Sequence, residues 1–495
     1  MKVNMLKKPN NYIFISGFIA AITGVLASST TFRVPLFLLI ALSVLFLIFV
    51  YKKIDIRFLT LKVFFVILAI ENDVGFLGLN MVHWYLVFML ASLIIYSFKE
   101  RTNEIKKTTL YLFFCLLTYI VISSIGMLFF SELKFSNGLM KAFKNIVLPT
   151  FSIIYLFKYI NSKKIFYSVI QVVILTSTLF SIVAIIQFLS KGLLLSGLLT
   201  NYRYLGLFNT VNLYISTADI QYIRAFVPHT DTFRAHGSFY AHNSFAAFVG
   251  SIAPLTIICI VKEKSKKIIY LFSLLVQTIA VYLTFSRGGL ITLLLAYIII
   301  YVIFYRKNKV IQIVTNILLI LILIPVTVIS YLLIGGNFHS SRFLNFDFKN
   351  ISEFSDRITL WNITIKESIN YLWFGTGNDF LNKNLTSFLI FEDVSPHNMF
   401  LHIIYSQGLL SLIILILLLL RLIVIFIKAL TLNMKSENEI VLICIFSSIV
   451  SYVGSGMLES MFINLNLKLL FCVLMSLFFI YYKIQFNKKE GKKNV

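Results

Sequence analysis

The stretch from Asn398 to Ile427 reads NMFLHIIYSQGLLSLIILILLLLRLIVIFI. It carries one charged residue, Arg421, and is long enough to cross a bilayer, which takes roughly 17 to 25 apolar residues in a helix. The whole chain has the same character, because 59% of its 495 residues are hydrophobic and only 13% are charged. Ordinary soluble domains carry about 25% charged residues, so the composition excludes a soluble globule and predicts an all-α polytopic membrane protein.

Similar apolar runs elsewhere predict about 12 to 14 transmembrane helices in total. The expected spans are 11–28, 34–51, 58–77, 82–97, 108–130, 143–160, 165–189, 241–261, 268–286, 288–305, 310–334, 398–427, 439–458 and 463–482. Two long hydrophilic stretches interrupt them. The chain therefore divides into an N-terminal transmembrane bundle (1–189), a loop (190–240), central transmembrane helices (241–334), a large loop (335–397), and C-terminal helices with a basic tail (398–495).

Lysine and arginine in short loops favour the cytoplasmic side of a membrane. If the N-terminus is inside and the chain crosses the membrane at each expected span, every basic cluster falls on the cytoplasmic side. These clusters are Lys52–Lys53, Lys99–Lys107, Lys163–Lys164, Lys262–Lys267, Arg306–Lys309 and Lys483–Lys493. Both termini are then cytoplasmic, and both long loops, 190–240 and 335–397, face the outside. We expect a bacterial cytoplasmic (inner) membrane protein whose active site is extracytoplasmic.

Arginine follows a different distribution from lysine. Seven of the eleven arginines fall on the outer side under this topology: Arg33, Arg203, Arg224, Arg234, Arg287, Arg342 and Arg357. Because the planar guanidinium group grips phosphate or carboxylate through two parallel hydrogen bonds, this distribution predicts an outer site for an anion.

The remaining composition excludes several classes. A net charge of +24 is typical of nucleic-acid-binding proteins, but here the lysines separate apolar runs, so we expect no nucleic-acid partner. The four cysteines, Cys115, Cys259, Cys444 and Cys472, lie in apolar runs without metal-ligand spacing, which predicts neither disulfides nor a zinc site. The basic N-terminus resembles a signal peptide without a small-residue cleavage site, which favours an uncleaved first helix.

The stretch FRAHGSFYAHN, from Phe233 to Asn243, ends the first long loop. Arg234 is a candidate anion ligand. The alternative is an interfacial belt, in which the aromatic residues lie at headgroup level and the arginine reaches water. His236 and His242 have poor spacing for metal ligands across a helix start, so no metal is expected.

The stretch TFSRGG, from Thr284 to Gly289, joins two spans through almost no loop. An arginine at such a junction is costly unless it meets water, a partner or an anion. The N-terminus of the following helix adds free amides and the positive end of its dipole. Arg287 is therefore a second candidate, with anchoring in lipid headgroups as the alternative.

The large loop contains SDRITLWNITIKE, from Ser355 to Glu367. Ser355 or Asp356 is the expected N-cap of an amphipathic helix that lies along the membrane or over the site. Its apolar residues recur at helical spacing, at Ile358, Trp361, Ile365, Ile369 and Leu372. The turn FGTGN from Phe374 ends this helix, and its two glycines are too few for a nucleotide fingerprint.

Ser395-Pro396-His397-Asn398 closes the large loop and opens the next span. Histidine is the side chain that accepts and releases a proton most readily near neutral pH, which makes His397 the candidate base. The alternative is a polar residue that caps a helix at the membrane interface. Pro396 fits the beginning of that helix.

Four motifs in this order resemble the O-antigen ligase and polymerase superfamily. They are R-x-x-G-x-F with a following H-N, S-R-G-G, D-R-x-x-x-W ahead of a G-x-G turn, and P-H-N, within residues 230–430. The resemblance implies a membrane glycosyltransferase related to the GT-C architecture, which transfers glycan from undecaprenyl diphosphate on the outer face, without an essential metal or any other cofactor. It assigns the essential positions to Arg287, Arg357 and His397. The larger number of spans departs from the twelve expected for ligases.

The residues support a consistent mechanism. Arg287 and Arg357 would stabilise the leaving diphosphate, and His397 would accept the proton of the attacking hydroxyl. Arg234, Arg342, Asp356 and Asn398 complete the expected substrate-binding set. Direct attack inverts the anomeric centre, so no carboxylate nucleophile is needed.

Two other classes stay open. A metal-dependent GT-C enzyme is expected to have paired acidic residues on an early outer loop, where only Glu71 and Asp73 come close. A transporter of lipid-linked oligosaccharide also needs cationic groups, but transporters place them near the membrane midplane.

The expected partners are a lipid-linked glycan donor, a glycan acceptor, membrane lipid, a chain-length regulator and a flippase. We favour a polymerase of surface-polysaccharide repeat units because two long outer loops offer room for two polymers. A ligase that attaches O-antigen to lipid A core is the alternative.

Overall fold

The computed structural model describes residues 56–69, 75–76, 79–80, 82–83, 85–90, 107–130, 135–189, 234–239, 241–304, 313, 316, 352–381, 395–431 and 436–490. The expected spans 11–28 and 34–51 lie outside the described residues, as do nearly all of 310–334, most of the loop 190–240, and residues 335–351 and 382–394 of the large loop. Arg342 is among the residues outside the description.

The described part of the chain is helical apart from one hairpin, which confirms the all-α class. The hairpin pairs β1 (Gly75–Phe76) with β2 (Leu79–Asn80) in antiparallel register. The helices are α3 (Ile56–Leu68), α5 (Lys107–Ile125), η1 (Gly126–Phe130), α6 (Phe135–Ala142), η2 (Phe143–Val147), α7 (Leu148–Tyr159), α8 (Lys163–Leu189), α11 (His242–Lys262), η4 (Lys264–Lys266), α12 (Lys267–Leu283), α13 (Arg287–Phe304), α15 (Ser352–Asn370), α16 (Met399–Gln407), α17 (Leu409–Thr431), α18 (Ser436–Gly456) and α19 (Leu465–Glu490).

Six helical segments among the described residues are long and apolar enough to cross a membrane. They are Phe135–Tyr159, Lys163–Leu189, His242–Lys262, Leu409–Thr431, Asn438–Gly456 and Leu465–Gln485. Three shorter apolar helices accompany them, at Cys115–Phe130, Lys267–Leu283 and Arg287–Ile303. The chain is therefore a multi-pass membrane protein.

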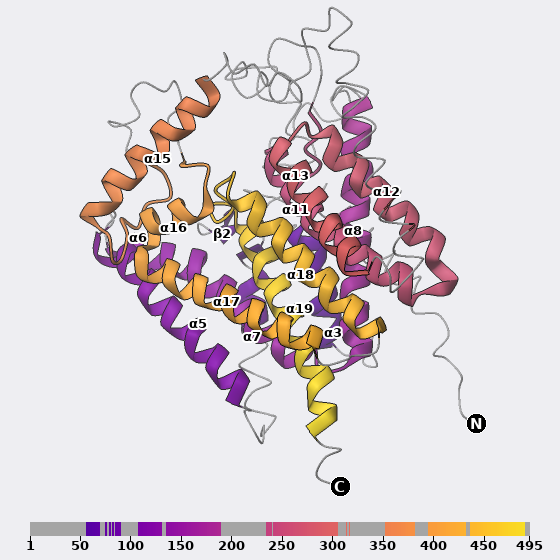
Figure 1. Ribbon diagram of the computed structural model, residues 1–495. Helices are drawn as coiled ribbons and strands as arrows, with labels where there is room; N and C mark the ends of the chain where they lie inside the picture. The colour runs from indigo at the N-terminus through magenta and orange to yellow at the C-terminus, as the bar shows by residue number, and fades with distance from the viewer. Residues whose placement is uncertain are drawn as a thin grey trace, which may run out of the picture.

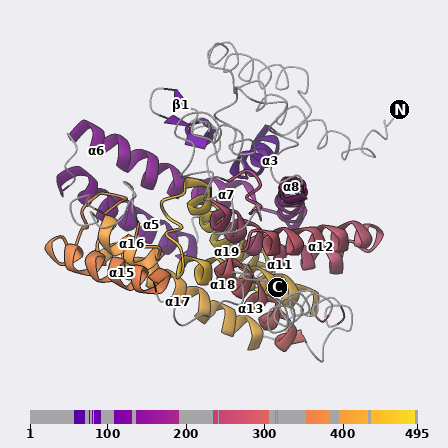
Figure 2. The same ribbon diagram turned by 90° about the horizontal axis from the view of Figure 1, so that it is seen from above.

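Helix α11 is the most deeply buried helix of the described bundle. Every residue from Phe245 to Ile260 is buried, which follows from a sequence that is apolar on all sides and must pack on all sides. Small residues permit close approach to α18, where the Ser451 hydroxyl donates to the Gly250 carbonyl at 3.2 Å. Helices α7, α18 and α19 lie between α5 and α15–α17 on one side and α8 and α11–α13 on the other (Figures 1 and 2).

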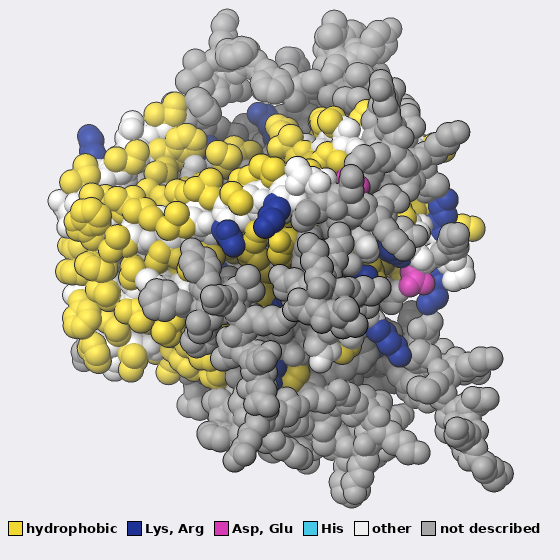
Figure 3. Space-filling model, turned by 60° about the horizontal axis from the view of Figure 1, so that its bottom comes forward, with side chains coloured by type: hydrophobic (Ala, Val, Ile, Leu, Met, Phe, Trp, Pro, Cys, Tyr) yellow, Lys and Arg dark blue, Asp and Glu magenta, His cyan; other side chains and the backbone are white. Residues whose placement is uncertain are grey.

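The outer helices present apolar side chains to their surroundings. Leu417, Leu420, Val424 and Ile427 of α17 are exposed, as are Ile268 and Phe272 of α12. Figure 3 shows hydrophobic side chains over much of the described surface on one side. Such a surface is stable against lipid and unfavourable in water, which agrees with a membrane location.

Three sequence expectations need correction. The predicted span 398–427 is two helices, because the chain breaks between α16 and α17 at Gly408, where φ is 86°. The predicted span 58–77 ends early, since α3 stops at Leu68 and the β1–β2 hairpin follows. Helix α15 begins at Ser352, so Ser355 and Asp356 lie inside the helix instead of capping it.

The chain at the Gly408 break is hydrogen-bonded to the FGTGN turn of the large loop, which begins at Phe374. Thr376 donates its backbone N–H to the Tyr405 carbonyl at 2.7 Å, and Leu409 donates to the Leu372 carbonyl at 2.7 Å. A Cβ at Gly408 would lie 2.2 Å from the Trp373 carbonyl oxygen, so only glycine fits this crossing. The turn FGTGN thus packs α15 against the end of α16.

The predicted amphipathic helix is present in α15, and its apolar stripe faces outward. Ile358, Ile365 and Ile369 are exposed, whereas Thr364 and Ser368 are buried. Each of these two hydroxyls donates to the carbonyl four residues earlier in the helix, which satisfies it internally. An exposed apolar stripe on a polar loop helix fits contact with the membrane surface.

Candidate functional site

The turn between α18 and α19, residues 457–464, carries the centre of the candidate site. Backbone bonds from Leu458 to Ser455 and from Met461 to the Glu459 carbonyl hold this turn tightly. Glu459 is partly buried, with 21% of its side chain exposed. Four separate segments of the chain bring polar groups to it or to its neighbours.

His397 forms the shortest link between the large loop and this turn. Its Nδ1 lies 3.0 Å from Oε2 of Glu459. Because a carboxylate accepts, Nδ1 carries the proton and Nε2 becomes the proton-accepting nitrogen of a neutral ring. The side chain is 41% exposed, which leaves room for a ligand beside the ring.

The backbone at His397 is held in a conformation that few residues other than glycine adopt, with φ at 47°. Neighbouring contacts fix it there. The Trp361 indole N–H of α15 donates to the Pro396 carbonyl at 2.8 Å, and the Asn398 side chain donates to the Met457 carbonyl at 3.1 Å. A strained backbone conformation persists where several surrounding contacts hold it in place, and such positions are often found at functional sites.

Asn398, a predicted substrate ligand, is the N-cap of α16. Its Oδ1 accepts the backbone N–H groups of Phe400 and Leu401 at 2.9 and 3.1 Å. Its amide nitrogen is bound to the 457–464 turn, so the side chain positions His397 through the backbone.

Arg357 of α15 binds the same turn. Its NH1 donates to the Leu458 carbonyl at 3.1 Å, and its NH2 lies 3.6 Å from Oε1 of Glu459. A guanidinium group has five N–H donors, so these contacts leave donors for an anion. A third of the Arg357 side chain is exposed, so an anion can reach it.

Helix α11 contributes the third set of partners. The Asn243 amide donates to Oε1 of Glu459 at 2.5 Å. One residue earlier, His242 Nε2 lies 2.9 Å from NH1 of Arg234. The guanidinium group can only donate, so His242 accepts through Nε2. Arg234 therefore reaches the site through the first turn of α11.

Arg287 enters from the beginning of α13. Ser286 caps this helix, since its hydroxyl accepts the Gly289 N–H at 3.3 Å. The helix starts against the 457–464 turn, because a Cβ at Gly288 would lie 2.8 Å from Cδ1 of Leu458. Arg287 is half-buried and stands one residue from this contact.

The electrostatics favour an ionised Glu459. Burial acts to raise the pKa of its carboxyl, but the hydrogen bond from His397 and the electrostatic interactions with His397, Arg357 and His242 outweigh burial and lower the pKa. An ionised Glu459 can orient the His397 ring and stabilise it when it becomes protonated.

His236 is buried beside the site and has a structural role. Its Nδ1 donates to the Phe239 carbonyl at 2.8 Å, and burial lowers its pKa to about 4, against a small opposing effect of that hydrogen bond. Gly237, with φ at 58°, exchanges two backbone hydrogen bonds of 2.9 Å with the Gln187 side chain. The turn 234–239 is therefore rigidly held.

The structure thus brings together four predicted residues, namely Arg234, Arg357, His397 and Asn398, with Arg287 at the edge of the same turn. Arg342 and the side chain of Asp356 lie outside what the structure describes. Sequence reasoning missed Glu459 and the role of Asn243. One signal was present: Glu459 is an acidic residue in the very short loop between the expected spans 439–458 and 463–482.

Residues 270–416 match the family model described as O-antigen ligase. This segment contains Arg287, Arg357, His397 and Asn398, whereas Arg234, Asn243 and Glu459 lie outside it. No curated protein matches the sequence.

Proposed function

We propose that this membrane protein, whose residues 270–416 match the O-antigen ligase family model, transfers a glycan from a lipid diphosphate to the hydroxyl of an acceptor glycan. The family supports a glycan ligase or polymerase that acts on lipid-linked glycans. The donor would be undecaprenyl diphosphate-linked oligosaccharide. The reaction would be inverting and would need no nucleotide sugar.

One observation carries this proposal. His397 and Arg357, which the sequence places 40 residues apart around a loop, meet on one carboxylate, Glu459, at 3.0 and 3.6 Å. A glycan transfer in which a diphosphate leaves needs a group that accepts the proton of the attacking hydroxyl and a cationic group that stabilises the diphosphate. A histidine oriented by a carboxylate, beside a guanidinium group, supplies both.

The proposed step assigns each proton and electron pair. The acceptor hydroxyl oxygen attacks the anomeric carbon and gives its proton to Nε2 of His397. The bond between the anomeric carbon and the diphosphate oxygen breaks, and its electron pair leaves with the diphosphate. Arg357 and Arg287 stabilise the charge that develops there, while Glu459 stabilises the protonated imidazole.

The location of the basic residues supports an extracytoplasmic site. Helix α11 runs from His242 beside the site to Lys262, where the lysine-rich turn of η4 follows. Its 21 residues rise about 30 Å, which matches the hydrocarbon thickness of a bilayer. The positive-inside rule then assigns the lysine end to the cytoplasm and the site to the other side.

A carboxylate–histidine pair also distinguishes this proposal from transport. A transporter needs cationic groups for its cargo but no oriented proton acceptor, and its binding groups lie near the midplane. Here the site lies at the end of α11, α13 and α18, at the 457–464 turn. We therefore retain transfer chemistry over transport.

Within the family, we propose a polymerase that joins repeat units of a surface polysaccharide. The test is deletion of the gene followed by gel analysis of the surface glycan. A polymerase predicts loss of chain length with single repeat units still attached. Loss of all attachment to lipid A core would show a ligase, and loss of surface glycan together with lipid-linked precursor held inside the cell would show a transporter.

A further inference from the structure

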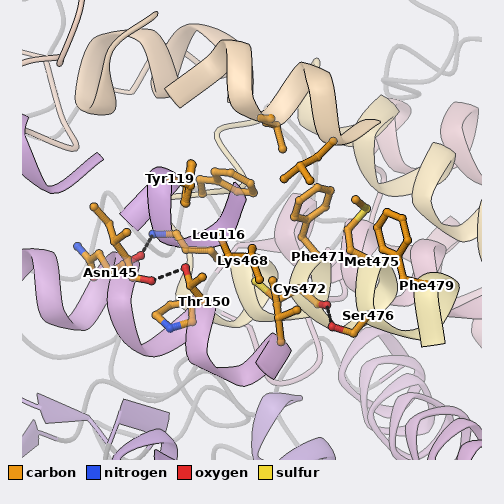
Figure 4. A pocket seen from close by; sticks show the side chains of 16 residues that line it. Leu116, Tyr119, Asn145, Thr150, Lys468, Phe471, Cys472, Met475, Ser476 and Phe479 are labelled. Carbon is orange, nitrogen blue, oxygen red and sulfur yellow. Dashed lines mark hydrogen bonds between the residues drawn. The ribbon is translucent and has the colours of Figure 1, made fainter. Parts of the chain in front are cut away.

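A cavity lies away from the His397 site, between the helix pair α5 and α17 and the helix pair α7 and α19 (Figure 4). Its walls are mostly apolar and aromatic, with Leu116, Ile153, Leu415, Phe471, Met475 and Phe479 among them. Apolar walls of this kind within a membrane bundle suit a hydrocarbon chain.

Lys468 supplies a positive charge at one end of this cavity. The residue is 7% exposed, and its ammonium group donates to the Asn145 carbonyl at 2.9 Å (Figure 4). An ammonium group has three N–H donors, so two remain for a further acceptor. Within the part of the chain that the structure describes, no carboxylate lies within ion-pair distance of Lys468.

The nearest acidic partner is already engaged. Asp379 pairs with Lys141 at 3.2 Å, and Lys141 also donates to the Gly377 carbonyl at 2.6 Å. Two lysines therefore share one described carboxylate in this region of the bundle. A buried, uncompensated cation in a membrane protein is costly, and an anionic ligand would offset that cost.

The acceptor of Lys468 is itself unusual. Asn145 belongs to η2, a π-helical turn, whose extra residue interrupts the regular hydrogen bonding between α6 and α7. Such turns occur often at functional sites. A purely structural explanation is that Lys468 satisfies this one carbonyl, and any test has to separate that role from ligand binding.

The cavity is charged at one end and mostly apolar along the rest of its length, as a phosphate-bearing lipid is. Lys468 lies one turn into α19, and Cys472, Met475 and Phe479 follow along the same side of the helix. From Lys468 to Phe479 the helix rises about 16 Å, the length of a medium hydrocarbon chain. We propose that this cavity holds the hydrocarbon chain of a phosphate-bearing lipid, with the lipid phosphate bound to Lys468.

This site is separate from the transfer site. The charged and titratable groups that act on Glu459 are His397, Arg357 and His242, whereas those that act on Lys468 are Asp379, Cys472 and Lys141. Phe462 lines the cavity, three residues after Glu459 in the same turn. A lipid in the cavity would therefore pack against the turn that carries Glu459 without entering the His397 site.

The test measures binding to the full-length protein in detergent by native mass spectrometry, so it does not depend on glycan transfer. The probes are phosphatidylglycerol, undecaprenyl phosphate, diacylglycerol as a chain without phosphate, and inorganic phosphate alone. The variants are Lys468→Gln and Cys472→Trp, which fills the cavity. Matched controls are Lys428→Gln and Leu417→Trp, both at exposed positions of α17.

We expect wild-type protein to retain a phosphate-bearing lipid at least about tenfold better than diacylglycerol, as a desolvated charge-assisted hydrogen bond provides. Lys468→Gln should lose this preference, Cys472→Trp should lose both lipids, and the controls should behave as wild type. The tighter of the two phosphate-bearing probes identifies the natural source, a membrane phospholipid or a polyprenyl phosphate.

Equal retention of both lipid types by wild type and Lys468→Gln would overturn the proposal, as would binding of inorganic phosphate as tight as that of either lipid. If Lys468→Gln does not fold, Lys468→Arg keeps the charge and should keep the preference, and loss of the preference in folded Lys468→Arg would also contradict it.

Discussion

The imidazole Nδ1 of His397 lies 3.0 Å from Oε2 of Glu459, across 62 residues of sequence. This contact joins the end of the large loop to the turn between the last two helices. It makes Glu459 the positioning residue of the proposed reaction, because the carboxylate fixes both the ring orientation and the position of the ring proton.

Glu459→Gln should therefore reduce transfer strongly while the protein stays inserted. The amide keeps the shape of the side chain but loses the charge that stabilises a protonated His397, so we expect a loss of about 10²-fold or more in kcat with little change in KM. The measurement is transfer from a labelled lipid-linked glycan by purified protein.

A matched control exists at the far end of the bundle. Glu263 likewise accepts a hydrogen bond from an amide side chain, that of Gln171 at 3.2 Å. Glu263→Gln should leave transfer unchanged. Equal losses in the two variants would show that the effect of Glu459→Gln is general and not tied to His397.

Replacing either site arginine by lysine should also impair transfer. Arg357→Lys and Arg287→Lys keep the charge but lose the planar fork, and we expect kcat/KM to fall by about tenfold to a hundredfold. Arg421→Lys, at an exposed position of α17, is the control and should retain full activity. Wild-type activity in both site variants would show that Arg357 and Arg287 do not bind the diphosphate.

The lowered pKa of Glu459 predicts a pH-dependent contribution to stability. A carboxyl whose folded-state pKa lies below its usual value of 4.5 stabilises the folded protein above that value and loses this contribution as the pH falls through the folded pKa. The difference in unfolding temperature between wild type and Glu459→Gln should thus be constant near neutral pH and shrink in acid. A difference that grows in acid would have the wrong sign.

Two glycines make contrasting packing predictions. A Cβ at Gly289 would lie 2.6 Å from Cβ of Ala246, which cannot move without shifting α11, whereas the nearest atom to a Cβ at Gly250 is 3.7 Å away. Gly289→Ala should destabilise the protein by about 1 to 3 kcal/mol and disturb the start of α13. Gly250→Ala should be neutral or stabilise by up to about 1 kcal/mol. Thermal unfolding of the two variants compares them, and similar unfolding temperatures would contradict the close contact.

The membrane class, most of the described helices and the family resemblance followed from the sequence. Hydropathy is local, so α8, α11, α18 and α19 were readily predicted. The break at Gly408 was not, because leucine-rich sequence continues beyond it and the cause is a packed turn more than thirty residues earlier, at Phe374 to Gly377.

The candidate site shows the same division. Arg357 and His397 stand out because charged and polar residues at a membrane boundary need a reason. Glu459 does not stand out in the same way, since its partners come from three distant segments and only the fold brings them together.

The central claim is that His397 accepts the proton in glycan transfer, and single-turnover transfer by purified His397→Ala tests it most directly. With donor binding measured separately, we predict donor binding near that of wild type and a loss of transfer of about 10²-fold or more. Transfer at the wild-type rate in folded His397→Ala would contradict the account.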